Sequence, residues 1–251
     1  MINIILHGCG GNMGKVVESI VTSSTDCKIV AGIDARDGIN ATYPVFTSAD
    51  KCNIDADVII DFSIASAVPA LLDFAKAKKI PVVLCTTGLS PELTEALQTY
   101  SKDVAVLKSA NMSLGVNLML SLVKKAAEML YDSNFDIEIV EKHHNQKIDA
   151  PSGTALALAD SINSALDNQM NYTYDRSQTR EKRNNREIGI HAVRGGTIVG
   201  EHDVIFAGKD EILTINHTAM SKEIFAVGAV KAAKFLAGKP AGFYTMENLM
   251  N

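Results

Sequence analysis

Short apolar runs alternate with amphipathic segments along residues 1–111 of the chain. A run that is apolar throughout is typical of a strand buried in a parallel sheet, whereas apolar residues three and four apart are typical of a helix. We expect strands over 2–8, 28–35, 56–63, 80–88 and 103–111. We expect helices over 15–23, 65–79 and 91–101. This alternation predicts an α/β fold with a doubly wound parallel sheet.

The pattern changes after Asn111, where the segments become longer and several strands look half exposed. We expect helices over 113–131, 153–166 and 224–238. We expect strands over 135–145, 189–196, 197–208 and 211–219. The last three strand-like runs follow one another through glycine-containing turns, so they predict an antiparallel sheet with one solvated face. The second part of the chain is therefore expected to be an α+β domain, with a polar loop over 172–189.

Composition narrows the class of protein. The 251 residues are 47% hydrophobic and carry a formal net charge of −5, which gives no general reason to expect binding to nucleic acid or to a membrane surface. No run approaches the ~20 apolar residues of a membrane span. The four cysteines, Cys9, Cys27, Cys52 and Cys85, form no C-x-x-C pair. We therefore expect reduced thiols and a cytoplasmic enzyme or regulator.

The stretch GCGGNMG follows the first predicted strand and opens the first predicted helix. A nucleotide pyrophosphate needs close backbone approach and free N–H groups at a helix N-terminus. The usual G-x-G-x-x-G pattern would put its third glycine at Met13. Read through Gly8, Gly11 and Gly14, the stretch fits a G-x-x-G-x-x-G variant of the dinucleotide fingerprint.

An acid at the end of the second predicted strand supports the dinucleotide interpretation. Asp34 lies about 20 residues past the glycines, where a carboxylate accepts hydrogen bonds from the adenine ribose. Asp34 favours NADH, because a 2′-phosphate would meet its charge, and Arg36 could offset that repulsion and admit NADPH. Ligands of such sheets lie at the carboxyl ends of the strands. Three further strand ends carry small polar residues, at 61–63, 85–88 and 109–113.

The stretch EKHHNQKIDAPSGTA gathers titratable side chains just before a predicted helix. His143 and His144 should leave a strand on opposite faces, which is poor geometry for two ligands of one metal, so no metal site is expected. Acid–base work near neutral pH and anion binding are the other reasons for histidines here. Lys147 suits a carboxylate. A capped helix preceded by a solvated loop remains the alternative.

The start of that helix offers anion-binding groups of its own. Ser152 is expected to be the N-cap, with Gly153 and Thr154 presenting free N–H groups. A cluster of cations beside a helix N-terminus fits a substrate with more than one carboxylate. We therefore expect a small-molecule dicarboxylate as the ligand.

At this point the stretch EKHHNQKIDAPSGTA resembles the signature of the 4-hydroxy-tetrahydrodipicolinate (dihydrodipicolinate) reductases. Further stretches resemble that family's other blocks, in order: GCGGNMG, DFS, TTG, SANMSLGVN, RGGTIVGEH and GFYTMENL. The resemblance covers essentially the whole chain. It implies NAD(P)H-dependent reduction of 4-hydroxy-tetrahydrodipicolinate to tetrahydrodipicolinate, in lysine biosynthesis through diaminopimelate.

The resemblance also implies roles for single residues. His143 is the proton donor or acceptor, and Lys147 is a second proton donor. His144, Lys147, Gly153 and Thr154 contact the substrate. Arg36 is included among the expected cofactor contacts because it could admit a 2′-phosphate. The full set is Gly8, Cys9, Gly10, Gly11, Asn12, Met13, Asp34, Arg36, Cys85, Thr86, Thr87, Ser109, Ala110, Asn111 and Met112.

The family fold is a Rossmann-like domain with an inserted α+β domain that binds substrate and builds a homotetramer. By resemblance, the dinucleotide-binding domain covers 1–113 and 221–251, and the inserted domain covers 114–220. The chain departs from the commoner family pattern at three places. Cys85 replaces a glycine, Gly196 and Thr197 stand where the family more often has Gly-Asp, and Asp34-Ala35-Arg36 replaces a Glu-Arg pair.

Two rival interpretations share the cofactor fingerprint. A semialdehyde dehydrogenase usually needs a nucleophilic cysteine in its second domain, and the chain has no cysteine after Cys85. A dinucleotide-sensing regulator should carry a basic recognition element. The basic run RSQTREKRNNR lacks a helix-turn-helix context and is expected to be a solvated loop or a contact between subunits.

Overall fold

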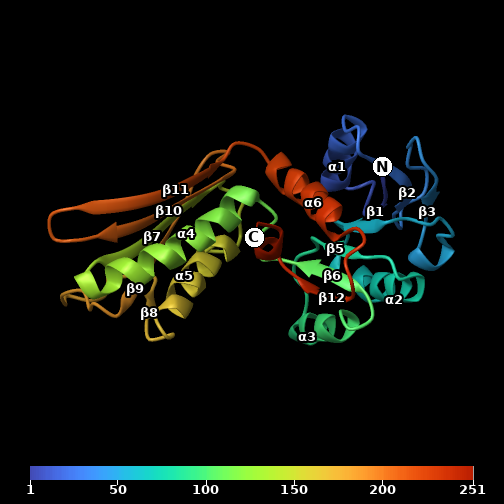
Figure 1. Cartoon of the computed structure of the whole chain (residues 1–251). Coiled ribbons are helices and arrows are strands. Elements are labelled where there is room, and N and C mark those ends of the chain that lie inside the picture. The colour runs from blue at the N-terminus through green and yellow to red at the C-terminus, as the bar shows by residue number, and fades with distance from the viewer. Residues whose placement is uncertain (251) are drawn as a thin grey trace. The chain divides into compact units, whose positions relative to one another are not determined.

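The computed structural model describes residues 1–250, which divide into two compact units (Figure 1). The first unit contains Met1–Met112 and the segment that begins at Glu223, and the second contains Ser113–Lys222. The chain therefore leaves the first unit once and returns to it for its last helices and strand.

The first unit is built on a seven-stranded sheet in which every strand pair is parallel. Its strands, in spatial order, are β12 (Gly242–Tyr244), β6 (Ala105–Lys108), β5 (Val82–Leu84), β4 (Val58–Asp61), β1 (Ile2–His7), β2 (Cys27–Ile33) and β3 (Val45–Phe46). The five strands expected from the apolar runs are present. The runs did not predict β3 and β12, because two or three residues are too few to show a period.

Helices cover both faces of this sheet (Figure 1). The helices α1 (Asn12–Thr22) and α6 (Glu223–Leu236) pack together on one face, and α2 (Val68–Lys78) and α3 (Pro91–Tyr100) lie on the other. Apolar strand residues such as Ile5, Ile59 and Val82 are fully buried between the layers. The doubly wound architecture places the carboxyl ends of β1, β4, β5 and β6 along one edge.

The second unit contains a five-stranded mixed sheet rather than the expected antiparallel one. Its strands, in spatial order, are β11 (Ile212–Ala219), β10 (Gly200–Ala207), β7 (Asp136–His143), β9 (Glu187–Arg194) and β8 (Asn171–Thr173). The strands β9 and β10 follow each other in sequence, yet β7 lies between them and pairs parallel with β9 and antiparallel with β10. The expectation failed because sequence neighbours were assumed to pair, whereas the insertion of β7 buries its apolar residues centrally.

Two helices, α4 (Leu114–Leu130) and α5 (Gly153–Ala165), cover one face of the mixed sheet (Figure 1). Side chains on β7 alternate strictly between buried and partly exposed, so Ile137, Ile139, Glu141 and His143 all point to the covered face. This alternation places two titratable groups in line with the hydrophobic core.

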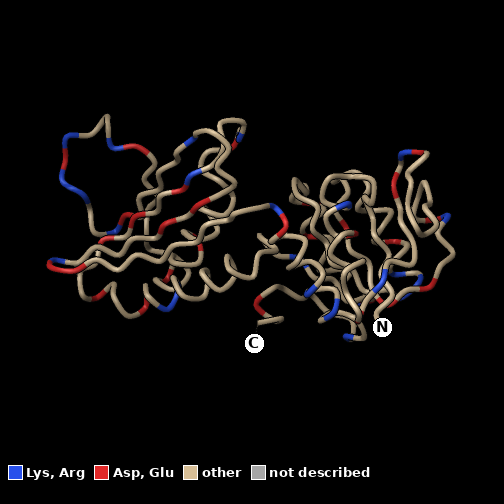
Figure 2. Tube along the Cα trace, turned by 90° about the horizontal axis from the view of Figure 1, so that it is seen from above, with Lys and Arg blue, Asp and Glu red and all other residues tan. Residues whose placement is uncertain are grey.

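The remaining elements are short. They are α7 (Met246–Met250) and the 3-10 turns at Ala49–Lys51, Ala65–Ala67 and Tyr131–Ser133. Within residues 1–250, the helices lack the combined length and hydropathy needed to cross a membrane. Figure 2 shows acidic and basic positions interspersed over both units rather than sorted into separate faces.

Candidate active site

The glycine loop between β1 and α1 is packed too tightly for side chains at two of its glycines. Gly8 has a φ of +80°, and a Cβ there would lie 2.5 Å from the carbonyl oxygen of Phe62. A Cβ on Gly14 would collide with the carbonyl oxygens of Gly8 and Cys9. Gly11 is the N-cap of α1 and supplies no side-chain cap. The first turn of α1 therefore keeps backbone N–H groups available for an anion such as a pyrophosphate.

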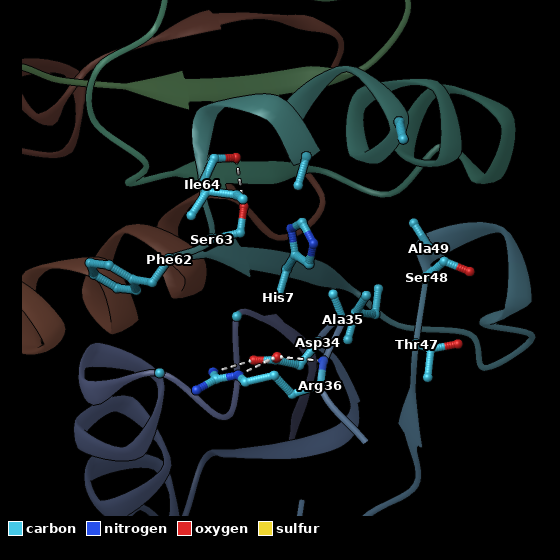
Figure 3. A pocket seen from close by; sticks show the side chains of 15 residues that line it. His7, Asp34, Ala35, Arg36, Thr47, Ser48, Ala49, Phe62, Ser63 and Ile64 are labelled. Carbon is cyan, nitrogen blue, oxygen red and sulfur yellow. Dashed lines mark hydrogen bonds and ion pairs between the residues drawn. The ribbon is translucent and has the colours of Figure 1, made fainter. Parts of the chain in front are cut away.

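Asp34 lies directly beside this loop (Figure 3). Its carboxylate accepts hydrogen bonds from the Gly10 N–H at 2.9 Å and from two nitrogens of the Arg36 guanidinium at 2.9 Å each. The hydrogen bonds from Arg36 hold the pKa of Asp34 below its usual range, against the opposing effect of burial. The loop, the acid and the cation that the sequence singled out are thus brought together.

A cavity of about 420 Å³ opens at this point. Its lining includes Gly8, Gly11, Asp34, Arg36 and the ring of His7, which Figure 3 shows in the middle of the pocket. Three expected contacts from the glycine loop, Cys9, Gly10 and Asn12, line neither this cavity nor the second one described below. Cys9 is buried with its sulfur turned toward Gly32, and Asn12 is exposed on α1.

A second cavity, of about 390 Å³, collects the expected residues from the other strand ends. It is lined by Met13, Phe62, Ser63, Cys85, Thr86, Thr87, Lys108, Ser109, Ala110, Asn111, Met112 and Phe225. Burial raises the pKa of the Cys85 thiol far above its usual range, so this cysteine stays neutral and unreactive. The glycine loop and the two cavities together fit a dinucleotide that lies across the carboxyl edge of the sheet.

The second unit places a buried carboxylate against His143. Glu141 is fully buried, and one of its oxygens accepts a hydrogen bond of 2.6 Å from His143 Nδ1. Arg194 on β9 holds both Glu141 oxygens at 2.7 Å, and the Ser152 N–H donates to one of them at 3.0 Å. Burial alone would raise the pKa of Glu141, but the bonds from Arg194 and His143 outweigh it and lower the pKa. Glu141 therefore fixes the His143 tautomer with Nε2 as the free nitrogen.

His143 is a neutral base at pH 7 in this setting. Burial lowers its pKa, Glu141 acts in the opposite direction, and the charges of Lys147 and Arg194 add to the lowering. His202 on β10 meets the His143 ring edge-on, with ring centroids 5.2 Å apart. A neutral imidazole held by one nitrogen is suited to accepting or passing on a proton through the other.

The start of α5 has the geometry that the sequence predicts. Ser152 is the N-cap, and its hydroxyl accepts from the Ala155 N–H at 3.1 Å and contacts His202 Nε2 at 3.0 Å. Gly153 and Thr154 form the first turn, and a Cβ on Gly153 would meet open space. A side chain at position 153 would therefore meet no neighbouring atom, and the Asp149 carboxylate already interacts with the Gly153 N–H at this helix end.

Lys147 lies in the turn between β7 and α5. Its ammonium forms an ion pair of 2.8 Å with Asp149, and its backbone N–H bonds to the carbonyl of His144. His144 is half-buried just past the end of β7. His143, His144, Lys147 and the first turn of α5 therefore lie in one polar region of the second unit.

Three residues of this region were missed by sequence reasoning. Glu141 bonds to His143, Arg194 holds Glu141, and the His202 ring meets His143 edge-on, although none of the three was assigned a role. The strict alternation of β7 was the available signal for Glu141, because it puts residues 141 and 143 on the same face. Arg194 and His202 come from β9 and β10, and only the strand order reveals their proximity.

Comparisons with known proteins identify the family to which the chain is related. The family models for the N-terminus and the C-terminus of dihydrodipicolinate reductase match residues 2–112 and 115–250. A 4-hydroxy-tetrahydrodipicolinate reductase from Caldanaerobacter subterraneus subsp. tengcongensis is 53% identical over 250 residues, covering 100% of this chain and 98% of that protein. One from Clostridium tetani is 48% identical over 251 residues, with the same coverage.

A solved structure shares the fold. The dihydrodipicolinate reductase from Paenisporosarcina sp. TG-14, solved with dipicolinate bound, has a TM-score of 0.83 at 24% identity and covers 99% of both chains. The two family models together match nearly the whole chain, including the glycine loop of the first unit and the Glu141–His143 cluster of the second. The chain belongs to the dihydrodipicolinate reductase family.

Proposed function

We propose that the protein is a 4-hydroxy-tetrahydrodipicolinate reductase. It reduces 4-hydroxy-tetrahydrodipicolinate to tetrahydrodipicolinate and water with NADH or NADPH, in lysine biosynthesis through diaminopimelate. The observation that carries this proposal is the 53% identity to a reductase of that name over the whole chain. The rival dehydrogenase and regulator interpretations have no comparable support.

The cofactor half of the reaction belongs to the first unit. The glycine loop and the α1 N-terminus hold the pyrophosphate, Asp34 takes the adenine ribose, and the cavity that includes Thr86 and Thr87 takes the nicotinamide. Bound NAD(P)H supplies the hydride. Arg36 already contacts Asp34 with a largely exposed guanidinium, so it can turn toward a 2′-phosphate. The protein is therefore expected to accept both cofactors.

The substrate half belongs to the second unit. His144, Lys147 and the N–H groups of Gly153 and Thr154 bind the two substrate carboxylates through charge and helix-end hydrogen bonds. His143 and Lys147 move the proton that accompanies loss of the ring hydroxyl as water. Glu141 keeps the His143 ring in the orientation this step needs. The dipicolinate bound to the Paenisporosarcina reductase is itself a dicarboxylate, which supports this ligand class.

A coupled assay tests the proposal directly. The upstream condensation product is generated in place, and nicotinamide absorbance is followed with NADH and with NADPH in separate reactions. We expect oxidation of the cofactor only when the condensation product is present. If neither cofactor is oxidised, the proposed function is wrong.

The proposal includes a cytoplasmic homotetramer. The edge strand β11 exposes Ile212 and Leu213, with 69% and 43% of their surfaces accessible, and so offers apolar area for a second copy. Light scattering coupled to size exclusion should give four times the mass of one chain. A monomer at micromolar concentration would contradict the tetramer and leave the reaction untouched.

A further inference from the structure

Four neighbouring strands of the first unit end in a continuous row of polar side chains. His7 ends β1, Asp61 ends β4, Thr86 follows β5, and Lys108 ends β6. The strands lie in the order β6-β5-β4-β1, and His7 is in register with Asp61. We call His7, Asp61, Thr86 and Lys108 the polar row.

Hydrogen bonds join every member of the polar row. Asp61 is fully buried, and its two oxygens accept from His7 Nδ1 at 2.7 Å and from the Thr86 hydroxyl at 2.6 Å. The backbone N–H of Ser63 adds a bond of 3.1 Å to the same carboxylate. The Thr86 carbonyl in turn accepts from the Lys108 ammonium at 2.7 Å. The row therefore fixes the loops that follow β4 and β5.

The polar row reaches both cavities of the cofactor site. His7 lines the cavity beside Asp34, whereas Thr86 and Lys108 line the second one, and Ser63 borders both. A dinucleotide across this edge puts its adenosine half beside Asp34 and its nicotinamide half in the second cavity. Lys108 thus brings an ammonium group to the nicotinamide side.

Lys108 carries a positive charge that is not needed to hold the loop after β5. A backbone carbonyl requires only a neutral donor, and moving a charge out of water costs free energy. Burial lowers the pKa of Lys108, while Cys85 and Asp61 act in the opposite direction. Within residues 1–250, the ammonium has no ion pair with a carboxylate. Its charge is therefore left to act on whatever occupies the cavity.

We infer that Lys108 determines which redox state of the nicotinamide the site prefers: it disfavours the oxidised, cationic ring relative to the reduced, neutral ring. This inference rests on the proposed function. Like charges in a partly buried site repel strongly, whereas a neutral ring meets no such penalty. The consequence is fast release of the oxidised cofactor and weak product inhibition by it.

Two substitutions separate charge from hydrogen bonding. Lys108→Gln keeps a donor for the Thr86 carbonyl and removes the charge, and Lys108→Arg keeps the charge. Dissociation constants of NADH and NAD⁺ are measured for the full-length protein by calorimetric titration. In Lys108→Gln the ratio of the NAD⁺ constant to the NADH constant should fall about fivefold or more, and in Lys108→Arg it should stay within about twofold of wild type.

Salt provides an independent readout. Ionic screening weakens the repulsion, so rising salt should reduce the ratio in the wild-type protein and leave it nearly constant in Lys108→Gln. A Gln variant that weakens or strengthens both cofactors equally would overturn the inference and leave Lys108 as a loop support. If circular dichroism shows that Lys108→Gln does not fold, the same two dissociation constants are measured for Lys108→Met, and the salt series of the wild type tests the inference without any substitution. A wild-type protein that binds neither cofactor would instead contradict the proposed function.

Discussion

Glu141 shows how much one side chain can decide in this fold. It is fully buried, carries its charge, and has donors on both oxygens from Arg194, His143 and the Ser152 N–H. The buried carboxylate is stable only with all of these donors in place, because a buried charge without a partner costs several kcal/mol of folding free energy, on the order of 3–5. The same carboxylate determines which nitrogen of His143 carries a proton.

Replacing this carboxylate by an amide tests its effect on His143. In Glu141→Gln the ring loses its charged acceptor, so kcat should fall about tenfold to a hundredfold and the pH profile should shift to lower pH. Glu201→Gln is the matched control, since Glu201 pairs with Lys142 on the opposite face of the sheet. Steady-state rates across pH give both readouts. A kcat loss with an unchanged profile would mean that Glu141 acts on stability alone.

Lys147 offers a second test at the residue scale. Lys147→Ala removes the proposed proton donor and carboxylate partner, while the glycine loop of the first unit keeps all its groups. We expect kcat to fall at least about a hundredfold with NADH binding unchanged. Initial rates and NADH titration measure the two effects. Lys142→Ala, which removes a nearby lysine from the other face, should keep most turnover, and near-normal turnover in Lys147→Ala would disprove its role.

At the scale of elements, α6 packs closely against the backbone after β6 because Gly228 has no side chain. A Cβ on Gly228 would run into the carbonyl oxygen of Met112, and Met112 lines the second cavity. The glycine therefore permits a helix-to-backbone approach that no other residue allows. This contact couples the position of a C-terminal helix to the shape of a cofactor pocket.

Gly228→Ala should destabilise the protein despite the better helix propensity of alanine. The collision is with backbone and displaces α6 or Met112, so we expect a cost in the upper part of the usual range of about 1–3 kcal/mol, against a gain of about 1 kcal/mol in propensity. Urea unfolding measures the change, and NADH titration should show weaker binding. Val227→Ala, at a neighbouring position that is 38% exposed, serves as the control. A stabilised Gly228→Ala protein would show that the helix can move freely.

Element prediction from the sequence worked where the signal was local. Apolar runs located five parallel strands, and Ser152 was recognised as the cap of α5 because serine before a glycine and a threonine fits an N-cap. The failures were non-local. The place of β7 between β9 and β10, and with it the arrival of Arg194 and His202 beside His143, depends on strand order. His7 and Lys108 were likewise not singled out, since each ends an apolar run that looks complete without it.

At the scale of the whole molecule, buried histidines should make stability depend on pH. Burial, together with repulsion from His143 once that ring is protonated, lowers the pKa of His202 from 6.5 to about 4. Between these values the unfolded chain binds the proton and the folded chain does not, so the free energy of unfolding rises with pH. We expect a loss on the order of 3 kcal/mol from this group as pH falls from about 6.5 to about 4.

Urea unfolding at several pH values measures this loss. His202→Gln should flatten part of the dependence in that window, while the loss from His143 and His217, whose pKa values burial also lowers, and from paired carboxylates such as Glu141 remains. An unchanged slope in His202→Gln would show that His202 is not the group that titrates.

The return of the chain to the first unit constrains the order of events during synthesis. The sheet lacks its edge strand β12, and its face lacks α6, until residues beyond 223 have left the ribosome. At about 5–20 residues per second, residues 113–222 take on the order of ten seconds to appear. The second unit is therefore complete and free to fold while the N-terminal half is still waiting with an uncovered apolar face. During that interval the N-terminal half exposes the apolar surface that α6 later covers, a condition that favours aggregation of nascent chains.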